Sequence, residues 1–220
     1  MSTEVKICGI RTSSALDAAM DAGADYFGLV FFPRSPRNIS LEDAARLAER
    51  ARGRIKSVAL VVNAEDAEIK AIAETVAPDM FQLHGQETPE RTAAIRELVK
   101  RPVIKAVRVA TSGDAAHAEA YKDAADLILF DAKPSADDTH ALPGGNGLNF
   151  DWRLLEGLHN RMRFMLAGGL TPENVAEAIA LTGAAIVDVS SGVESAPGEK
   201  QIELIRRFIA VARASVPKDL

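Results

Sequence analysis

The sequence predicts an α/β fold in which eight consecutive strand–helix units close into a single-domain (βα)8, or TIM, barrel. Short apolar runs alternate with helix-forming segments along all 220 residues, and such alternation produces parallel βαβ units. The expected strands and helices number eight of each, which is the number that closes this kind of barrel. Hydrophobic residues make up 47% of the chain, enough to build the core of one domain over residues 1–220.

The expected strands are short apolar runs bounded by turn-forming residues. The second of them, residues 26–32, is apolar nearly throughout, as strands buried on both faces are. Together the strands cover residues 5–8, 26–32, 57–62, 80–83, 103–107, 127–130, 163–166 and 185–190.

The expected helices are marked by their ends as well as by their composition. Ser40 is placed to cap the helix that starts at Leu41, with Gly53 just beyond its end, and Pro89 occupies a first turn. The helices cover residues 13–22, 41–51, 65–76, 89–100, 115–121, 151–158, 172–181 and 201–214. The alternative architecture is an open doubly wound sheet, but eight short regular units without a dominant Gly-rich first turn favour closure.

Composition narrows the class of function. The net charge is −5 and no dense Lys/Arg run occurs, so we expect a small-molecule ligand, with no nucleic acid and no membrane partner. The single cysteine excludes an intrachain disulfide, and residues 1–4 lack the features of a signal peptide, so we expect a cytoplasmic protein. The four histidines show no metal-ligand spacing. No apolar heptad stands out, and we expect a monomer or a weak homodimer.

Barrel geometry predicts where the chemistry lies. The carboxyl ends of all eight strands form one face, and that face carries the active site in this fold. The residues expected there are unusually polar: Cys8, Arg34, Arg37, Asn63, Gln82, His84, Arg108, Asp131, Gly168, Gly169, Ser190, Ser191 and Gly192. The loop 132–149 follows Asp131 and is the longest irregular segment, and loops of that length are usually functional.

Two glycine-containing loops point to a phosphate. Gly168 and Gly169 lead into the helix near Pro172, and Ser190-Ser191-Gly192 ends the last strand. Glycines let backbone N–H groups approach an anion closely, and the loops after strands seven and eight are the usual phosphate site of this fold. A Gly-Gly pair alone is as often a plain tight turn, so the second loop at the neighbouring position carries the inference.

Six motifs, in order along nearly the whole chain, give a resemblance to a known family. They are KICGI (6–10), FPRSPR (32–37), QLHG (82–85), GGNG (144–147) with FDW (150–152), LAGGL (166–170) and VDVSSGVE (187–194). Each motif is modest by itself, but the ordered set resembles the phosphoribosylanthranilate isomerases. The chain departs from the family pattern at Asn146, where threonine is usual, and at Gln201, where aspartate is usual.

The resemblance implies an enzyme of tryptophan biosynthesis that works without metal or organic cofactor. It would convert N-(5-phosphoribosyl)anthranilate, an aldosylamine, to 1-(2-carboxyphenylamino)-1-deoxyribulose 5-phosphate. By this likeness Cys8 is the general base, Asp131 the general acid, and Arg37 the residue that holds the anthranilate carboxylate. The other expected substrate-binding residues are Gln82, His84, Gly145, Gly168, Gly169, Ser190, Ser191 and Gly192.

The residue types suit this reaction. Protonation of the ring oxygen opens the ring to an imine, and removal of the sugar C2 proton follows, so one acid and one base suffice. Burial favours the protonated form of a carboxyl group, whereas a thiol needs a pKa below about 8.5 to supply thiolate at neutral pH. Strand alternation places Lys6 one layer below Cys8, and we expect Lys6 to pair with Asp188 on the neighbouring last strand and to tune the thiol. A purely structural role for Lys6 is the alternative.

Plainer interpretations stand beside these roles. Free cysteines are more often inert core residues, and aspartate often caps a loop. Arg34 and Arg37 are both candidates for a carboxylate, and Arg37 is preferred by motif position only. His84 invites a general-base role, but Cys8 and Asp131 already account for both proton transfers, so we expect His84 and Gln82 to bind or to line the wall.

Three other functions compete with the isomerase. An indole-glycerol-phosphate synthase would need a catalytic lysine near the chain start, and Lys6 lies one layer too deep for that. A thiamine-phosphate-synthase-like transferase would need metal-binding acids. A non-catalytic sensor would keep the phosphate loops without Cys8 and Asp131. Acceptance of a second, histidine-pathway substrate stays open.

Overall fold

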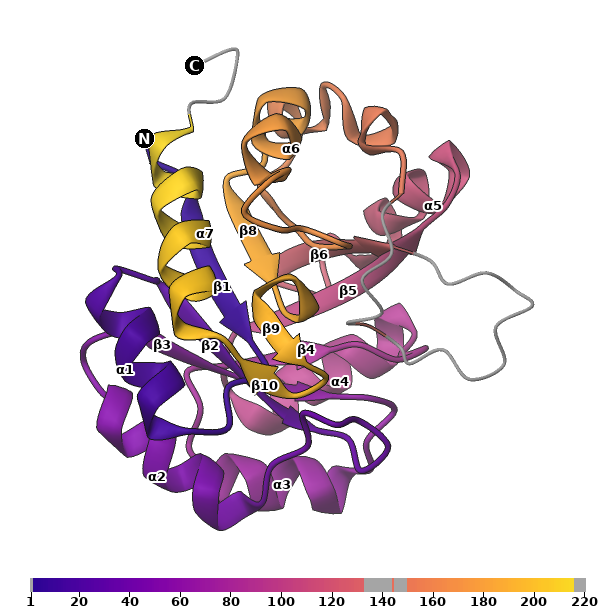
Figure 1. Cartoon of the computed structure of the whole chain (residues 1–220). Helices are drawn as coiled ribbons and strands as arrows, with labels where there is room; N and C mark the ends of the chain where they lie inside the picture. Colours follow the sequence, from indigo (N-terminus) through magenta and orange to yellow (C-terminus); the bar gives the residue numbers. More distant parts are fainter. Residues whose placement is uncertain (1, 133–143, 145–149, 216–220) are drawn as a thin grey trace.

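The computed structural model describes residues 2–132, 144 and 150–215, and it confirms the closed (βα)8 barrel. Eight parallel strands pair in chain order, and the last pairs with the first (Figure 1). The strands are β1 (Glu4–Cys8), β2 (Tyr26–Phe31), β3 (Lys56–Val61), β4 (Met80–Leu83), β5 (Val103–Val109), β6 (Leu127–Ala132), β7 (Phe164–Leu166) and β8 (Ile186–Val189).

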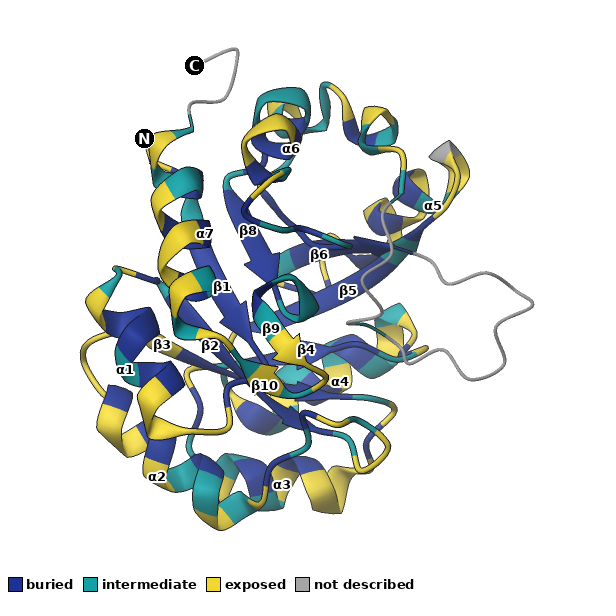
Figure 2. Ribbon diagram, in the orientation of Figure 1, coloured by how far each residue is buried: buried dark blue, intermediate teal, exposed yellow. Residues whose placement is uncertain are grey.

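The helices lie around the outside of the barrel, with their exposed sides facing solvent and the strands buried (Figure 2). The α-helices are α1 (Ser13–Asp21), α2 (Leu41–Ala51), α3 (Asp66–Thr75), α4 (Pro89–Val99), α5 (Ser112–His117), α6 (Val175–Thr182) and α7 (Ile202–Ala214). Ser40 caps α2 as expected, because its Oγ accepts a hydrogen bond of 3.1 Å from the backbone N–H of Asp43. A 3-10 helix, η1 (Ala118–Tyr121), continues α5.

The prediction of an α-helix over residues 151–158 is wrong. Two 3-10 helices occupy this part of the chain, η2 (Trp152–Leu155) and η3 (Leu158–Asn160). Between them Glu156 has a non-helical ψ of 131° and Gly157 has a φ of 73°, a left-handed conformation that interrupts a right-handed helix. Most of the loop expected over 132–149 lies outside the described residues.

Other boundaries differ by a few residues. Helix α5 starts earlier than expected because Thr111 and Asp114 form a capping box. Helix α6 starts later than expected, after Asn174, whose side chain bonds the backbone of the preceding turn. Strand β6 continues through Asp131, so this carboxylate belongs to the strand itself. A hairpin of β9 (Glu194–Ala196) and β10 (Glu199–Lys200) follows the 3-10 helix η4 (Ser191–Val193) and is absent from the predicted elements.

Apolar side chains fill the space inside the strands at the lower end of the barrel. This interior cluster contains Tyr26, Val58, Ile104, Ala106, Leu129, Met165, Ala167 and Ile186. A larger cluster, which includes Phe27, Phe81 and Phe130, packs the outer faces of the strands against the helices. The interior of the barrel is therefore a packed core rather than a pore, and a pocket opens at the carboxyl ends of the strands.

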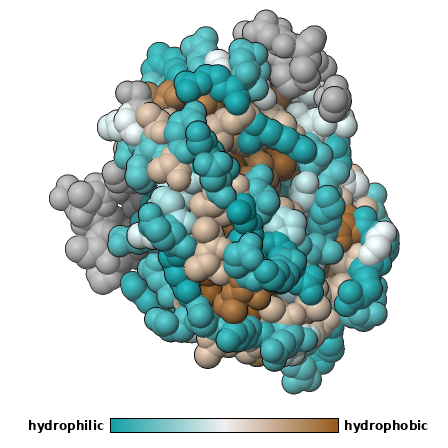
Figure 3. Space-filling model, turned by 180° about the vertical axis from the view of Figure 1, so that it is seen from behind, coloured by the Kyte–Doolittle hydropathy of each residue, from teal (hydrophilic) through white to brown (hydrophobic). Residues whose placement is uncertain are grey.

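The outer surface gives little sign of a large apolar contact area on the face opposite that of Figure 1. This face is mostly hydrophilic, with apolar residues in separate small areas (Figure 3). Among the described residues, each helix is too short or too polar to cross a bilayer.

A buried ion pair joins β5 to the loop after β4. The Nζ of Lys105 lies 2.7 Å from Oε2 of Glu87, and the two side chains are 3% and 2% exposed. Lys105 also donates to the carbonyl of Gly85, and Glu87 accepts from the backbone N–H of Asn63. Burial by itself would raise the pKa of Glu87, but Lys105 and the backbone donors hold this pKa below its ordinary value.

Replacing Glu87 with glutamine should destabilise the fold by about 3 kcal/mol at neutral pH, because it leaves the Lys105 charge buried without its partner. Urea unfolding of Glu87→Gln and of the parent measures this difference. Because the pKa of Glu87 is lower in the folded protein than in the unfolded chain, its stabilisation is present above the ordinary glutamate pKa and is lost as the pH falls through the folded-state value. The exposed pair of Glu49 with Arg52 supplies the control, and Glu49→Gln should change little.

Candidate active site

A pocket opens at the carboxyl ends of the strands, as the barrel predicts. It encloses about 770 Å³ of space, counting the part open to solvent. Nine of the residues expected from the sequence line it: Cys8, Arg37, Gln82, His84, Asp131, Gly168, Gly169, Ser190 and Ser191. The tertiary fold therefore gathers residues from the ends of six strands and from the loops that follow them.

Two expected site residues do not fall on this lining. Gly192 lies in η4, where an added Cβ would meet the carbonyl oxygen of Leu170 at 1.9 Å, so this glycine allows the loops after β7 and β8 to touch. Gly145 lies outside the described residues. The structure also separates the two candidate arginines, because Arg37 is buried against the pocket and Arg34 is exposed.

Two further polar residues of the mouth face elsewhere. The side chain of Asn63 accepts a hydrogen bond of 2.7 Å from the backbone N–H of Gln86 and so fastens neighbouring loops. Arg108 lines a second hollow, together with Lys105, His117 and Tyr121. Neither Asn63 nor Arg108 lines the pocket of Cys8 and Asp131.

The pocket has chemically distinct sides. Cys8 at the end of β1 and Asp131 in β6 are separated on one side by β7 and β8, whose loops supply Gly168 and Ser190. On the other side, β2 and β3 and the residues after them supply an apolar wall of Val30, Phe32, Leu60 and Val62. The site thus offers N–H and hydroxyl donors on one side, a surface for an aromatic ring on the other, and two ionisable groups between them.

Asp131 ends a chain of hydrogen bonds. Gln82 Nε2 lies 2.8 Å from His84 Nδ1, and His84 Nε2 lies 3.1 Å from Asp131 Oδ2. With the Gln82 amide in this orientation, His84 Nδ1 accepts a hydrogen bond from Gln82, and His84 Nε2–H donates a hydrogen bond to Asp131 Oδ2. Asp131 Oδ1 accepts from the backbone N–H of Ala132 at 2.8 Å. These contacts fix the orientation of the carboxyl group at the pocket.

Beneath Cys8 lies the buried ion pair expected from the sequence. Lys6 and Asp188 are register partners of β1 and β8, and the Nζ of Lys6 lies 2.9 Å from Oδ1 of Asp188. Gly28 on β2 makes room for this arrangement. A Cβ at Gly28 would stand 2.8 Å from Cys8 Sγ and 3.3 Å from Lys6 Nζ, so a glycine is needed beside the thiol.

The protonation of Cys8 differs from the expectation. Burial raises the pKa of the Cys8 thiol above its ordinary value, and Asp188 acts in the same direction. Lys6 and Lys200 act in the opposite direction but do not outweigh burial. The expectation of a lowered thiol pKa is therefore wrong for the unliganded protein, because desolvation of the thiolate exceeds the attraction of the two lysines.

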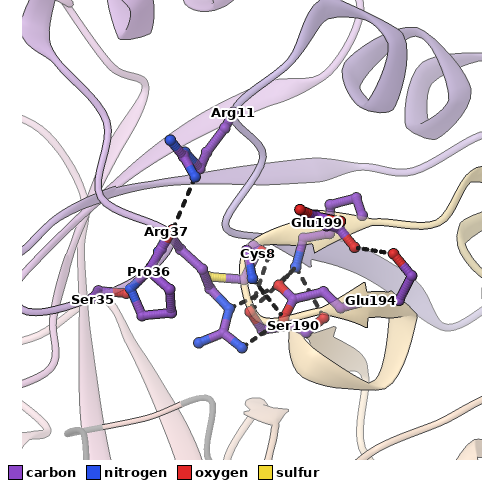
Figure 4. Close-up of polar contacts among 11 residues, drawn as sticks. Cys8, Arg11, Ser35, Pro36, Arg37, Ser190, Glu194 and Glu199 are labelled. Atoms are coloured by element: carbon purple, nitrogen blue, oxygen red, sulfur yellow. Dashed lines mark hydrogen bonds and ion pairs between the residues drawn. The ribbon is translucent and has the colours of Figure 1, made fainter.

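Arg37 belongs to a buried charge cluster that the sequence analysis missed. Its Nε and Nη2 each donate to a carboxylate oxygen of Glu194 at 2.8 Å, and Figure 4 shows the side chain beside Cys8 and Glu194. Lys200 Nζ donates to Oε1 of the same carboxylate at 2.7 Å. Glu194 is the last residue of the sixth sequence motif, and this motif is the one feature of the sequence that pointed to this region. We call Arg37, Glu194 and Lys200 the hairpin cluster.

The described residues contain no group of three or more histidine, cysteine, aspartate or glutamate side chains arranged to hold a metal ion. The ionisable residues of the pocket are instead engaged with one another or with backbone groups. The arrangement is suited to proton transfer and to the binding of an anion.

Comparison with known proteins agrees with this geometry. A family model described as N-(5'phosphoribosyl)anthranilate (PRA) isomerase matches residues 5–211. A curated relative from Rhodopseudomonas palustris (strain BisB5), named N-(5'-phosphoribosyl)anthranilate isomerase, is 53% identical over 98% of this chain and 98% of its own length. A similarly named relative from Paramagnetospirillum magneticum is 52% identical over 99% of this chain and 100% of its own.

Solved structures agree as well. The crystal structure of the phosphoribosyl anthranilate isomerase from Thermotoga maritima superimposes with a TM-score of 0.85 at 38% identity, over 96% of this chain and 98% of that one. A structure of this type of enzyme in complex with reduced 1-(o-carboxyphenylamino)-1-deoxyribulose 5-phosphate has a TM-score of 0.82 at 37% identity, with the same coverage.

Fold and site together define a (βα)8-barrel enzyme with its ionisable groups at the carboxyl ends of the strands. Within that class, the chain belongs to the N-(5'-phosphoribosyl)anthranilate isomerase family. The resemblance drawn from the six sequence motifs is thereby confirmed, and with it the expectation of an isomerase of tryptophan biosynthesis.

Replacing Gly28 with alanine should lower kcat/KM about 10- to 100-fold, because the added methyl group must displace the Cys8 thiol or the Lys6 ammonium. Steady-state kinetics of Gly28→Ala, with the melting temperature measured in parallel, tests this expectation. Gly113 is the matched control, since a Cβ there meets only Thr111 Oγ1 at 3.7 Å. Parent-like kinetics in Gly28→Ala would show that the thiol does not depend on this space.

Proposed function

We propose that this enzyme isomerises N-(5-phosphoribosyl)anthranilate to 1-(2-carboxyphenylamino)-1-deoxyribulose 5-phosphate, with Cys8 as general base and Asp131 as general acid. The observation that carries the proposal is that a thiol from β1 and a carboxyl group from β6 line one pocket, between glycine- and serine-containing loops and an apolar wall. The relative solved with the reduced ribulose phosphate compound supports the same class of ligand.

The ligand is oriented by the two sides of the pocket. The phosphate lies against Gly168, Gly169, Ser190 and Ser191, whose loops supply backbone N–H groups and the Ser191 hydroxyl to this side of the pocket. The anthranilate ring packs on the apolar wall, near Phe32 and Leu60, and its carboxylate reaches the guanidinium of Arg37. The pentose then lies between Cys8 and Asp131.

The reaction needs two proton transfers at the sugar. Asp131 donates a proton to the ring oxygen, the bond from that oxygen to C1 breaks, and an imine forms between C1 and the anthranilate nitrogen. Because the nitrogen keeps its own proton, this imine is formed in its protonated state. Cys8 then removes the C2 proton to give a neutral enolamine, which becomes the ketose product when C1 gains a proton and the C2 hydroxyl loses its proton. His84 and Gln82 hold the Asp131 carboxyl in place through the hydrogen bonds described above. No step requires a metal or an organic cofactor.

The same proposal covers the domain organisation, location and oligomeric state of the enzyme. Residues 1–220 act as one catalytic domain in the cytoplasm, with a small phosphosugar as the only partner and no nucleic acid or membrane. The enzyme is a monomer or a weak homodimer. A relative from Thermotoga maritima, described as monomers generated from a dimeric isomerase, supports the view that the barrel can exist in either state.

Removing either proton-transfer group should lower kcat about 10²- to 10⁴-fold. The assay follows the loss of anthranilate fluorescence in Cys8→Ala and Asp131→Ala, with circular dichroism to establish that both variants fold. Arg37→Ala and Arg34→Ala form a matched pair, and only the first should raise KM strongly, because Arg34 is exposed away from the pocket. Full activity in Cys8→Ala or Asp131→Ala contradicts the assigned roles, and a parent that binds the reduced product without turnover indicates a sensor.

The pH profile gives a second test. A base acts in its deprotonated form, and burial raises the pKa of Cys8 in the unliganded protein. The rising limb of kcat/KM should therefore lie above the ordinary cysteine range and coincide with the pH dependence of Cys8 alkylation by iodoacetamide. Because Cys8 is the only cysteine, alkylation reports on this thiol alone. A limb that is complete below the alkylation midpoint would show that another group is the base.

A further inference from the structure

Lys200 is a buried lysine outside the expected site. It is the last residue of β10, and its side chain is 2% exposed. Its ammonium donates to Oε1 of Glu194 at 2.7 Å, to the carbonyl of Ser190 at 2.9 Å and to Oγ of Ser190 at 3.3 Å. Three acceptors match the three N–H donors of an ammonium group, so the position of this charge is fixed.

The hairpin cluster holds more positive charge than its structure needs. Arg37 already satisfies both oxygens of Glu194 with a two-pronged ion pair. Lys200 adds a second cation to the same carboxylate. Two cations that share one anion leave a net charge of +1 on these three groups, and burial lowers the pKa of Lys200 as expected for such a site. A clamp that only fixed the hairpin would need one cation.

The excess charge lies next to Cys8. Ser190, which binds Lys200, donates from Oγ to the backbone carbonyl of Cys8 at 3.2 Å. The stem of Arg37 lies on Gly9, the residue after Cys8, where an added Cβ would meet Arg37 Cδ at 2.7 Å. Lys200 and Arg37 thus bring two buried cations to the end of β1, the first bonded to Ser190 and the second packed on Gly9.

Other charged groups also face the thiol and set the background. Lys6 and Asp188 lie beneath it as a neutral pair on β1 and β8. Asp131 and His84, from β6 and the end of β4, line the same pocket. The pair beneath is balanced in charge, whereas the hairpin cluster beside the thiol is not.

We propose that Lys200, held by Glu194 and Ser190, is a positioning residue that stabilises the thiolate form of Cys8. It touches no reacting atom and acts through the charge that the hairpin brings to the end of β1. Glu194 has two effects in this arrangement, since it holds Lys200 and Arg37 in place and partly offsets their charge. The inference rests on the proposed role of Cys8 as the base.

Alkylation of Cys8 by iodoacetamide across the pH range, without substrate, tests the inference in the full chain. In Lys200→Met the alkylation midpoint should move up by about 0.5 to 1 pH unit, equivalent to about three- to tenfold slower alkylation below the midpoint. Lys200→Arg should restore the parent midpoint. Lys70→Met, which removes an exposed lysine from α3, is the matched control and should leave the midpoint unchanged.

A second variant distinguishes electrostatics from structural damage. Glu194→Gln keeps both cations and removes their counter-charge, so it should move the midpoint down by about 0.5 pH unit. Damage to the hairpin would move both variants in the same direction. An unchanged midpoint in Lys200→Met, or a Lys200→Arg that behaves like it, overturns the inference. If Lys200→Met does not fold, Glu194→Gln decides alone, and a downward shift supports the inference while any other result rejects it.

The test separates this inference from the proposed function. Alkylation measures the thiol directly and requires no turnover. If the midpoints shift but Cys8→Ala is fully active, the hairpin tunes a thiol that is not the base. That result would reject both the assignment of Cys8 as the base and the catalytic role inferred for Lys200. An inactive Cys8→Ala with an unshifted Lys200→Met would reject the role of Lys200 alone.

Discussion

The pairing of β1 with β8 is the constraint on which the rest of the structure depends. It closes the barrel, and its register sets Lys6 opposite Asp188 inside the cylinder. Side chains alternate along a strand, so the same register brings Cys8 to the mouth beside Ser190. A slip of one residue would turn the thiol outward and leave a lysine without its partner. Closure in another register would leave a buried charge without its partner, and this would strongly destabilise the folded protein.

The two groups proposed to transfer protons, Cys8 and Asp131, occupy different electrostatic surroundings. Asp131 is held by hydrogen bonds with His84 and with the backbone N–H of Ala132. Cys8 is surrounded by ion pairs, with Lys6 and Asp188 below it and the hairpin cluster beside it. Burial nevertheless dominates at the thiol and raises its pKa. A thiolate with a raised pKa is a stronger base, which suits the proposed removal of a proton from carbon.

Local patterns predicted most of the scaffold. The apolar runs predicted the strands close to their observed bounds. Ser40 as an N-cap and Pro89 in a first turn did the same for the starts of two helices. The errors have one local cause and one tertiary cause. Residues 151–158 have helix-forming composition but are interrupted at Gly157. The short hairpin of β9 and β10 is stabilised by Glu194 together with Lys200 and Arg37. Arg37 is distant in sequence, and the two strands are too short to show a periodic pattern.

The sequence by itself determined the barrel, the face that carries the site, the family and the two residues proposed to move protons, because these depend on periodicity and on ordered motifs. It also predicted the pair of Lys6 with Asp188, since a closed barrel makes its first and last strands neighbours. Only the tertiary structure decided which arginine lies in the pocket, how the hairpin brings Glu194 and Lys200 to the thiol, and the direction in which the pKa of Cys8 moves. The reason is physical: burial and electrostatic attraction depend on distances between residues as far apart in the chain as Lys6 and Asp188, which are separated by 182 positions, and no local pattern records those distances.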